Sequence, residues 1–293
     1  MTDLITISSG GLTAQINPLG AELWSLTDAA GAQYMTDADP AFWGGHAPLL
    51  FPIVGSLAGD RLLVDSAEYP LPRHGFARRS NFDVLVAEDD FALFGLSDSD
   101  ATHAVFPFAF KLALAFRLDG ATLHTVATVT NPGTDPLPFS IGYHPAFAWP
   151  LPGGADKAAH KLVFAQAEPQ DVRRVTPATG LLRAASEPTP VVGRELALDE
   201  SLFTADALIW AGLNSRALSY GAEGGAWLDL EFPDTPDLGL WQVPGARYIC
   251  IEPWAGHADP EGFADEFSTK PGVITLAPGA SRRFALSVTV RGA

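Results

Sequence analysis

Short runs of alternating or β-branched apolar residues recur along the chain, separated by Gly, Pro, Asn and Asp. Such runs are typical of β-strands bounded by turns. They are LITISSG (4–10), LTAQINPLG (12–20), ELWSLTDAAG (22–31), FDVLVAEDD (82–90), FALFGLSD (91–98), FKLALAFRLDG (110–120), TLHTVATVTNPG (122–133) and FALSVTVRG (284–292). The pattern predicts an all-β protein.

The clearest alternation lies in residues 122–130. Leu123, Thr125, Ala127 and Val129 would lie on one face of a strand, and the residues between them on the other. Two unequal faces suit a strand of a β-sandwich. The NPGTDPLP segment that follows (131–138) is expected to be a turn whose prolines prevent further strand pairing.

Helical periodicity is weak, and only short turns are expected near residues 38–42 and 199–203. The segment 168–200, rich in Pro, Arg and Glu, is expected to be a long connection with short strands, and connections of this length often carry function. There is no internal repeat of about 20–50 residues. A single domain spanning residues 1–293 is therefore favoured.

The composition fits a folded protein rich in turns, with 47% hydrophobic residues, 28 Gly and 24 Pro. A formal net charge of -16 disfavours binding to nucleic acid or to an anionic membrane surface. No apolar run approaches the ~18 residues of a membrane helix. Neither a nucleic acid nor a membrane is expected as a partner.

The cysteine content and the N-terminal segment indicate a cellular compartment. One cysteine, Cys250 between Ile249 and Ile251, cannot form a disulfide within the chain and is expected to be a buried structural thiol. The N-terminal MTDLITISSGG has neither the basic nor the apolar region of a secretory signal. A cytoplasmic protein is expected.

Three parts of the sequence place His or Glu among apolar and rigid residues: 46–60 with 69–82, 139–147 (FSIGYHPAF) and 248–259 (YICIEPWAGHAD). Glu252 follows the apolar YICI, so its carboxyl is expected at the end of a buried strand, where burial raises the pKa and suits a general base. In general, however, a buried Glu more often pairs with an Arg or an amide, and lone histidines such as His144 and His74 more often bond only to backbone.

Other chemistries lack their sequence signatures. The histidines at 46, 74, 103, 124, 144, 160 and 257 show no metal-ligand spacing such as HExxH, so no metal is expected. Neither GxSxG, nor a P-loop, nor GxGxxG is present. A His/Glu acid-base pair remains as the candidate chemistry.

Four motifs occur in a characteristic order: LFPIVGSL (50–57), HGFAR (74–78), SIGYHPAF (140–147) and IEPWAG (251–256), with KPG at 270–272. In this combination the chain resembles the aldose 1-epimerase, or galactose mutarotase-like, superfamily, and within it the LacX-type branch. The resemblance implies a β-supersandwich of antiparallel sheets with a sugar-binding cleft. It implies no cofactor.

The resemblance also implies roles for individual residues. His144 would be the general acid and Glu252 the general base. His74 would contact the sugar ring, and Asp206 in LFTADALIW would bind sugar hydroxyls. Arg78 is a candidate for contact with a hydroxyl or a phosphate.

The chain departs from the family pattern after LFPIVG, where relatives commonly carry an arginine and this chain has Ser56. Arg61, Arg73 and Arg79 are candidates to replace that arginine. One or two of the aromatic residues near the motifs are expected at the cleft, among Trp24, Trp43, Phe76, Tyr143, Trp241 and Trp254.

The expected activity is interconversion of the α and β anomers of a hexose or hexose phosphate, by a monomer or weak homodimer acting on a small-molecule sugar. Glu252, ionised, would take the proton of the C1 hydroxyl, and His144 would protonate the ring oxygen. A carboxylate nearby is expected to hold the pKa of His144 up. The alternatives are a non-catalytic carbohydrate-binding or sugar-sensing protein, and a polysaccharide lyase or glycoside hydrolase, which would want a second carboxylate.

Overall fold

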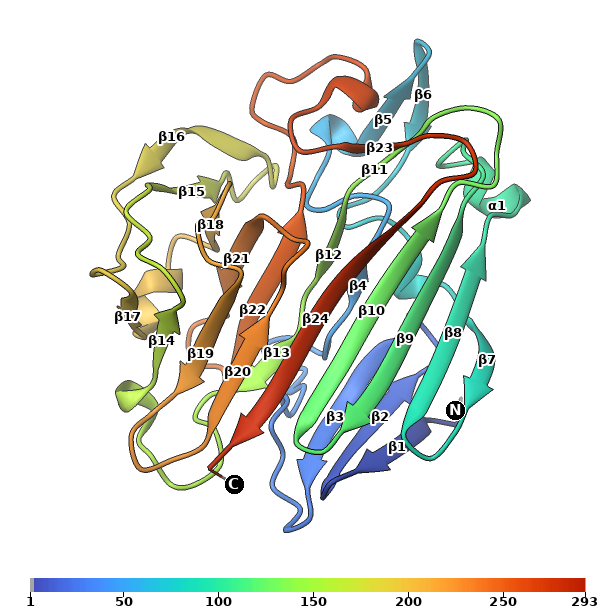
Figure 1. Ribbon diagram of the computed structural model, residues 1–293. Coiled ribbons are helices and arrows are strands. Elements are labelled where there is room, and N and C mark those ends of the chain that lie inside the picture. The colour runs from blue at the N-terminus through green and yellow to red at the C-terminus, as the bar shows by residue number, and fades with distance from the viewer. Residues whose placement is uncertain (1–2, 293) are drawn as a thin grey trace.

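The computed structural model describes residues 3–292, and two large antiparallel sheets dominate it (Figure 1). The nine-stranded sheet consists, in spatial order, of β17 (Glu195–Ala197), β14 (Lys161–Phe164), β19 (Ala217–Gly221), β20 (Trp227–Glu231), β24 (Ser281–Arg291), β10 (Thr122–Thr130), β9 (Lys111–Asp119), β8 (Phe91–Ser97) and β7 (Asp83–Ala87). The eight-stranded sheet consists of β16 (Leu182–Glu187), β15 (Val172–Val175), β18 (Leu208–Trp210), β21 (Asp237–Trp241), β22 (Tyr248–Ala255), β12 (Ile141–Tyr143) and β4 (Leu49–Leu50), with β13 (Ala146–Ala148) also paired to β22.

Three small sheets and a few short helices complete the fold. The small sheets are β1 (Ile5–Ser9), β2 (Leu12–Asn17) and β3 (Glu22–Asp28); β5 (Arg61–Val64) and β6 (Ala67–Pro70); and β11 (Leu137–Phe139) and β23 (Ile274–Leu276). The helices are α1 (Asp100–His103) and the 3₁₀ turns η1 (Ala58–Asp60), η2 (Ala77–Arg79), η3 (Lys157–Ala159), η4 (Glu200–Phe203) and η5 (Phe267–Thr269). None of the helices in residues 3–292 is long and apolar enough to cross a membrane.

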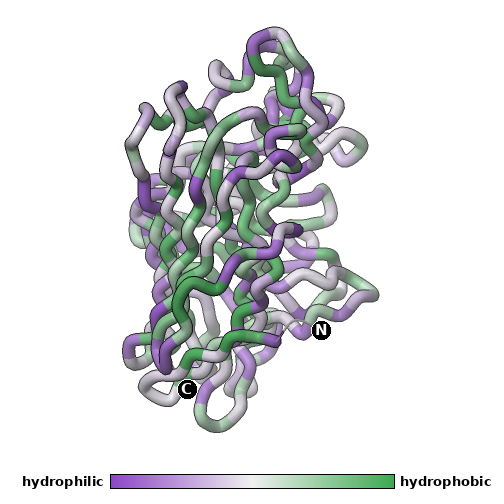
Figure 2. Tube along the Cα trace, turned by 90° about the vertical axis from the view of Figure 1, so that its right-hand side faces the viewer, coloured by the Kyte–Doolittle hydropathy of each residue, from purple (hydrophilic) through white to green (hydrophobic). Residues whose placement is uncertain are grey.

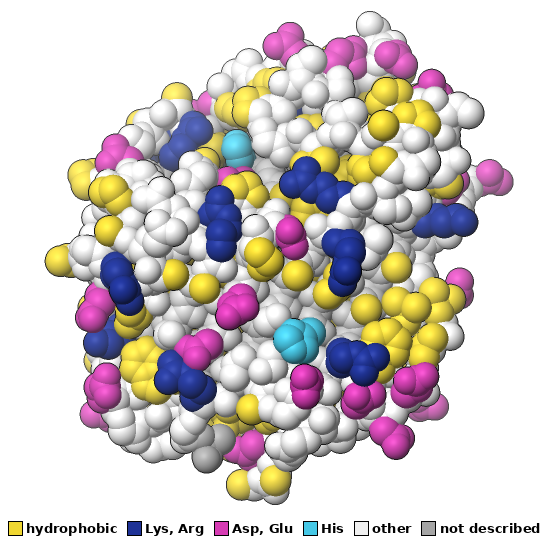
Figure 3. Space-filling model, in the orientation of Figure 1, with side chains coloured by type: hydrophobic (Ala, Val, Ile, Leu, Met, Phe, Trp, Pro, Cys, Tyr) yellow, Lys and Arg dark blue, Asp and Glu magenta, His cyan; other side chains and the backbone are white. Residues whose placement is uncertain are grey.

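Buried residues of the two large sheets share one large hydrophobic cluster, and two smaller clusters lie apart from it. Residues of β9 and β10 alternate between buried and part-exposed, as a strand with one covered face requires. Figure 2 shows hydrophobic stretches along the strands of the interior and hydrophilic ones in many of the turns. On the outer face of the nine-stranded sheet, acidic and basic side chains are interspersed with small apolar patches (Figure 3).

One buried hydroxyl links the two sheets. Tyr143, at the end of β12, donates to the carbonyl of Phe284 on β24 at 2.7 Å and accepts from the amide of Ala127 on β10 at 2.9 Å. A buried hydroxyl with both partners stabilises the packing, whereas an unpaired one would cost free energy. The sandwich is therefore joined by a polar contact as well as by apolar burial.

The strand predictions are confirmed. All eight predicted runs form strands, namely β1, β2, β3, β7, β8, β9, β10 and β24. Leu123, Thr125, Ala127 and Val129 are all buried. The segment 168–200 carries the short strands β15, β16 and β17, and a turn and a 3₁₀ helix occur where short turns were expected.

Two local predictions are wrong or incomplete. Pro138 does not prevent pairing, because it lies in β11 opposite Thr275 of β23. A two-stranded sheet leaves one edge of each strand free, so a missing N–H at that edge costs no ladder bond. Helix α1 was not expected; Ser99 and Thr102 form a capping box at its start, but four residues are too few for a periodic signal.

Candidate active site

His144 lies at a break in one strand of the eight-stranded sheet. Strands β12 and β13 pair with β22 in the same antiparallel register on the two sides of the break, and in that register His144 lies opposite Glu252. Pro145 has no N–H and cannot continue the ladder. Directly opposite residues have Cβ atoms about 4.5–5.5 Å apart, which brings the two side chains into contact.

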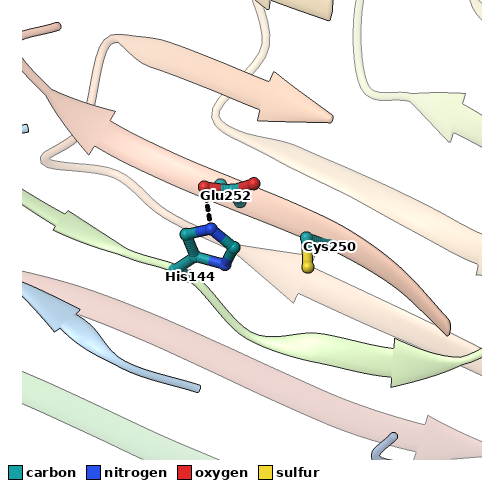
Figure 4. Close-up of side chains that lie close together, drawn as sticks. All are labelled: His144, Cys250 and Glu252. Atoms are coloured by element: carbon teal, nitrogen blue, oxygen red, sulfur yellow. Dashed lines mark ion pairs between the residues drawn. The ribbon is translucent and has the colours of Figure 1, made fainter. Parts of the chain in front are cut away.

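The two side chains form a buried pair. His144 Nε2 lies 3.2 Å from Glu252 Oε2, and the side chains are 9% and 2% exposed (Figure 4). The imidazole is surrounded by other rings, with centroids 5.0 Å from Trp43, 5.9 Å from Trp241 and 5.9 Å from His74. The pair is thus buried among aromatic rings.

Glu252 was expected at the end of a strand, but it lies inside β22. The strand continues through Pro253 to Ala255. Ile251 donates its amide to the carbonyl of Pro145, so Pro253, two residues further along, faces the same side. In the register of the pair it lies opposite Tyr143, the last residue of β12, so the missing N–H of Pro253 falls where the pairing of β12 ends.

The protonation of the pair differs from the sequence-based expectation. Burial raises the pKa of Glu252 well above its usual range; Arg73 opposes this shift and Asp206 adds to it. Burial, with Arg78 and Arg73, lowers the pKa of His144 to about 3. Both shifts favour the uncharged form of each group, a protonated carboxyl and a neutral imidazole. The expectation that the pKa of His144 is held up was wrong, because burial and two nearby guanidinium groups lower it.

A cavity of about 250 Å³ opens beside the pair. Its polar lining residues are Arg73, His74, Arg78, His144, Asp206 and Glu252, and its aromatic ones are Trp43, Trp241 and Trp254. The rest of the lining is small or apolar: Val54, Gly55, Val175, Gly180, Ala207, Ile209 and Ala258. Apolar walls with a few convergent polar groups are typical of a small-molecule site.

His74 is fixed by a strained turn. Its φ is 68° and that of Gly75 is 67°, in the left-handed region, where a Cβ on Gly75 would lie 2.3 Å from the carbonyl oxygen of Phe51. His74 Nδ1 accepts the amide of Gly55 at 3.1 Å, and Arg73 Nε lies 3.2 Å from Nε2. A neutral imidazole has one acceptor nitrogen, so only one of these contacts is a hydrogen bond at a time. The backbone amide is the less mobile donor, which favours the tautomer with the hydrogen on Nε2.

Arg78 and Asp206 reach the same cavity from two other segments. Arg78, on η2, donates to the carbonyl of Arg73 at 3.1 Å, and its buried Nε has no partner among the described residues. Burial, with Arg79 and Arg73, lowers its pKa to about 10. Asp206 precedes β18 with a φ of 70°, and its Oδ1 accepts the amide of Ala207 at 2.7 Å.

Relatives commonly carry an arginine where this chain has Ser56, and the structure shows which of the other candidate arginines reaches the cavity. Ser56 is 4% exposed and does not line the cavity, and a Cβ on Gly180 would lie 2.5 Å from its hydroxyl oxygen. Of the three candidate replacements, Arg73 lines the cavity, Arg61 lines a different one and Arg79 lines neither. Arg73 directly precedes the HGFAR motif. Its position in the cavity depends on the turn at His74, which the sequence alone did not predict.

Three of the six candidate aromatic residues line the cavity, rather than one or two: Trp43, Trp241 and Trp254. The indole of Trp254 spans the width of β22, because Cβ atoms on Gly142 and Gly239, in the two flanking strands, would lie 2.3 Å and 2.4 Å from it. Sequence reasoning missed this arrangement, since it depends on two glycines far apart in the chain. Val175 and Gly180, from the segment 168–200, also line the cavity, and no motif in the sequence pointed to them.

Fold and site together define a protein of the sugar-epimerase class, and comparison with known proteins agrees. The chain matches the aldose 1-epimerase family over residues 3–289. The plasmid form of protein LacX from Lactococcus lactis subsp. lactis is 31% identical over 296 residues, covering 98% of this chain and 99% of that relative. This protein belongs to the aldose 1-epimerase family.

Solved structures confirm the galactose mutarotase-like supersandwich. A galactose mutarotase related enzyme from Lactobacillus acidophilus has a TM-score of 0.91 at 30% identity, covering 99% of this chain and 98% of that one. A galactose mutarotase-like protein from Lactobacillus casei ATCC 334 has a TM-score of 0.90 at 30% identity, covering 99% and 100%. The family places the chain in the carbohydrate epimerase and isomerase class of enzymes.

Proposed function

We propose that this protein is an aldose 1-epimerase that interconverts the α and β anomers of a hexose or hexose phosphate. The observation that carries the proposal is the buried His144–Glu252 contact of 3.2 Å in the wall of a cavity of about 250 Å³. A protein that only binds sugar needs no buried acid next to a buried base. Family membership supports the same reaction class.

The reaction requires two proton transfers. The C1 hydroxyl must lose a proton while the ring oxygen gains one, and the opened C1 then rotates before the ring closes. The raised pKa of Glu252 and the lowered pKa of His144 favour a starting state with the proton of the pair on Glu252. Its transfer across the 3.2 Å contact gives a carboxylate and an imidazolium, with Glu252 as the base and His144 as the acid. Ring closure on the other face uses the same groups in reverse.

The remaining cavity residues would hold the sugar. His74 Nε2–H, Arg78 and Asp206 supply donors and an acceptor for ring oxygens and hydroxyls. The three tryptophans supply apolar faces for the C–H surfaces of a pyranose. Arg73 and Arg78 are the groups that would pair with a phosphate if the substrate carries one. The reaction needs no cofactor, and we place it in the cytoplasm, in a monomer or weak homodimer.

The test is the rate of anomer exchange, measured by NMR for glucose, galactose and glucose 6-phosphate. The wild-type protein should accelerate the exchange of at least one of them, and Glu252→Gln should reduce that acceleration by about 10²–10⁴-fold. Glu231→Gln is the matched control, because Glu231 is an exposed glutamate on β20 of the other large sheet. A wild-type protein that binds one of these sugars by calorimetry but accelerates none would instead be a sugar-binding protein.

A further inference from the structure

Cys250 lies beside the acid-base pair without taking part in the proposed reaction. A ring nitrogen of His144, the Sγ of Cys250 and a carboxylate oxygen of Glu252 all lie within 4.8 Å of one another. Figure 4 shows the three side chains together, with the second ring nitrogen of His144 on the side of Cys250. That nitrogen, Nδ1, is buried and has no hydrogen-bond partner among the described residues.

Strand geometry brings the three groups together. Cys250 and Glu252 are two residues apart on β22, so their side chains leave the same face of the sheet. His144 lies opposite Glu252 in the register of β12 and β13. Trp43 and Trp241 pack over Cys250 and also line the cavity, so the thiol lies directly beneath the cavity wall.

Imidazole, thiolate and carboxylate are the donor set of zinc. Zinc bonds to these groups are about 2.0–2.3 Å long, so neighbouring ligand atoms of a tetrahedral site lie about 3.4–3.6 Å apart. The 3.2 Å contact between His144 and Glu252 is already close to that separation. The sulfur, within 4.8 Å of both, would have to come closer to them by up to about 1.4 Å.

Charge and access also suit a zinc ion. A thiolate and a carboxylate carry two negative charges, so one Zn²⁺ leaves the buried site neutral, whereas an unpaired ion there would be very costly. Three protein ligands leave a fourth position, and it would face the cavity that His144 and Glu252 line. Mg²⁺ and Ca²⁺ prefer oxygen ligands and do not suit this set.

We propose that His144, Cys250 and Glu252 form a binding site for a soft divalent cation of the Zn²⁺ type, and that the bound ion inhibits the protein. The inhibition, though not the binding, rests on the proposed function. The ion takes the Nε2 lone pair of His144, an oxygen of Glu252 and the sulfur of Cys250, with loss of the protons of the carboxyl and the thiol. Neither group can then exchange a proton with a sugar.

Binding is tested on metal-free protein by calorimetry with Zn²⁺ and by absorption spectroscopy with Co²⁺, which reports a thiolate ligand directly. Wild-type protein should bind one Zn²⁺ per chain and show a thiolate-to-cobalt charge-transfer band. Cys250→Ser and Cys250→Ala should lose the band and weaken the binding by at least about 100-fold, the upper range for losing even an outer partner of a metal site. Mg²⁺ should give no signal. Unfolding curves of both variants check that they are folded.

Inhibition is tested by the anomer-exchange rate at increasing Zn²⁺ concentrations. The wild-type protein should lose its activity at the concentration that fills the calorimetric site, while Cys250→Ala keeps its basal rate and resists zinc. Zinc binding that is equal in wild type and both Cys250 variants, or absent from all of them, overturns the proposal. Zinc binding that depends on Cys250 in a protein without anomer exchange would keep the metal site and overturn the proposed function instead.

Discussion

The two large sheets are built in opposite ways. The nine-stranded sheet has long strands at its centre, such as β9 and β10 with nine residues each, in continuous register. Polar side chains on its outer face bond to each other across strands, as Thr122 does with Thr289 at 2.8 Å and His124 with Ser287 at 2.9 Å. The eight-stranded sheet includes strands of two or three residues, and Pro145 and Pro253 adjoin its break.

The polar groups differ in the same way. In the eight-stranded sheet, His144 Nδ1 and Trp254 Nε1 are buried without a partner among the described residues. A regular ladder would satisfy its polar groups internally and leave nothing for a ligand. The comparison teaches that regular pairing satisfies the polar groups of one sheet, while the broken sheet leaves some of its polar groups without a partner among the described residues.

The largest expected effect comes from one substitution made in both sheets. His144→Asn should reduce the acceleration of anomer exchange by about 10²–10⁴-fold, because the amide cannot act as an acid at the ring oxygen. His124→Asn, on β10, should leave the rate unchanged. Exchange rates by NMR give both values. Equal losses in the two variants would show that the difference between the sheets is not functional.

Truncation of a core side chain in the nine-stranded sheet should lower the stability of the protein and leave its activity unchanged. Phe116 on β9 is 2% exposed and packs edge-to-face on Phe94 at 5.9 Å. Phe116→Ala should lower the free energy of unfolding by about 3–5 kcal/mol through the lost burial and the cavity left behind. Denaturant unfolding measures that loss, and kcat/KM of the folded variant should be unchanged. A fall in kcat/KM would contradict the separation of stability from activity.

A glycine substitution sharpens the comparison. A Cβ on Gly142 would lie 2.3 Å from the indole of Trp254, so Gly142→Ala should cost about 1–3 kcal/mol and raise KM by shifting the cavity wall. In the nine-stranded sheet, a Cβ on Gly95 would meet the tip of Leu85, an exposed side chain, at 2.9 Å. Gly95→Ala should be neutral or slightly stabilising, since Leu85 can turn away. Unfolding curves and KM values for both variants test this difference. Equal losses of stability in the two variants would contradict it.

The effect that appears only below neutral pH is a dependence of stability on pH. His46, stacked on Trp24 at 3.7 Å, has its pKa lowered to about 4 by burial. The unfolded chain, with a histidine pKa near 6.5, binds more protons between about pH 4 and 6.5, so the free energy of unfolding falls as the pH falls through that window.

Comparing wild type with His46→Gln at several pH values isolates this contribution. The wild-type slope should be steeper by up to about 1.4 kcal/mol per pH unit. Above pH 7 the two slopes should agree, because a neutral histidine binds the same number of protons in both states. Slopes that agree across the whole range would show that His46 is not held neutral by the fold.

Sequence predicted the two sheets unequally. Alternation predicted β7, β8, β9, β10 and β24 of the nine-stranded sheet, and the long strands among them have a clear period because one face is buried. Strands β14, β17, β19 and β20 of the same sheet were not among the predicted runs. Strands β4, β12 and β13 are too short for any period, and were found only as parts of motifs. Element length, rather than composition, decided what could be predicted.

Some features of the site could also be predicted from the sequence and others could not. His144, Glu252, His74, Arg78 and Asp206 all line one cavity, as their resemblance to family motifs suggested, although their roles remain proposals. The protonation of the pair could not be predicted, because it depends on complete burial and on guanidinium groups brought close by the turn at residues 73–79. The tryptophan wall and the thiol beneath it depend on cross-strand neighbours, which one sequence does not specify.

The Tyr143 hydroxyl has a mechanical consequence for the site. It is anchored to Phe284 and Ala127 of the opposite sheet, and the next residue along the chain is His144. An anchor to the other layer therefore lies one residue before the break in the strand. His144 and Glu252 belong to the same sheet, so the anchor acts by fixing the end of β12 against β24 and β10. It restricts how far the chain at the break can shift along β22.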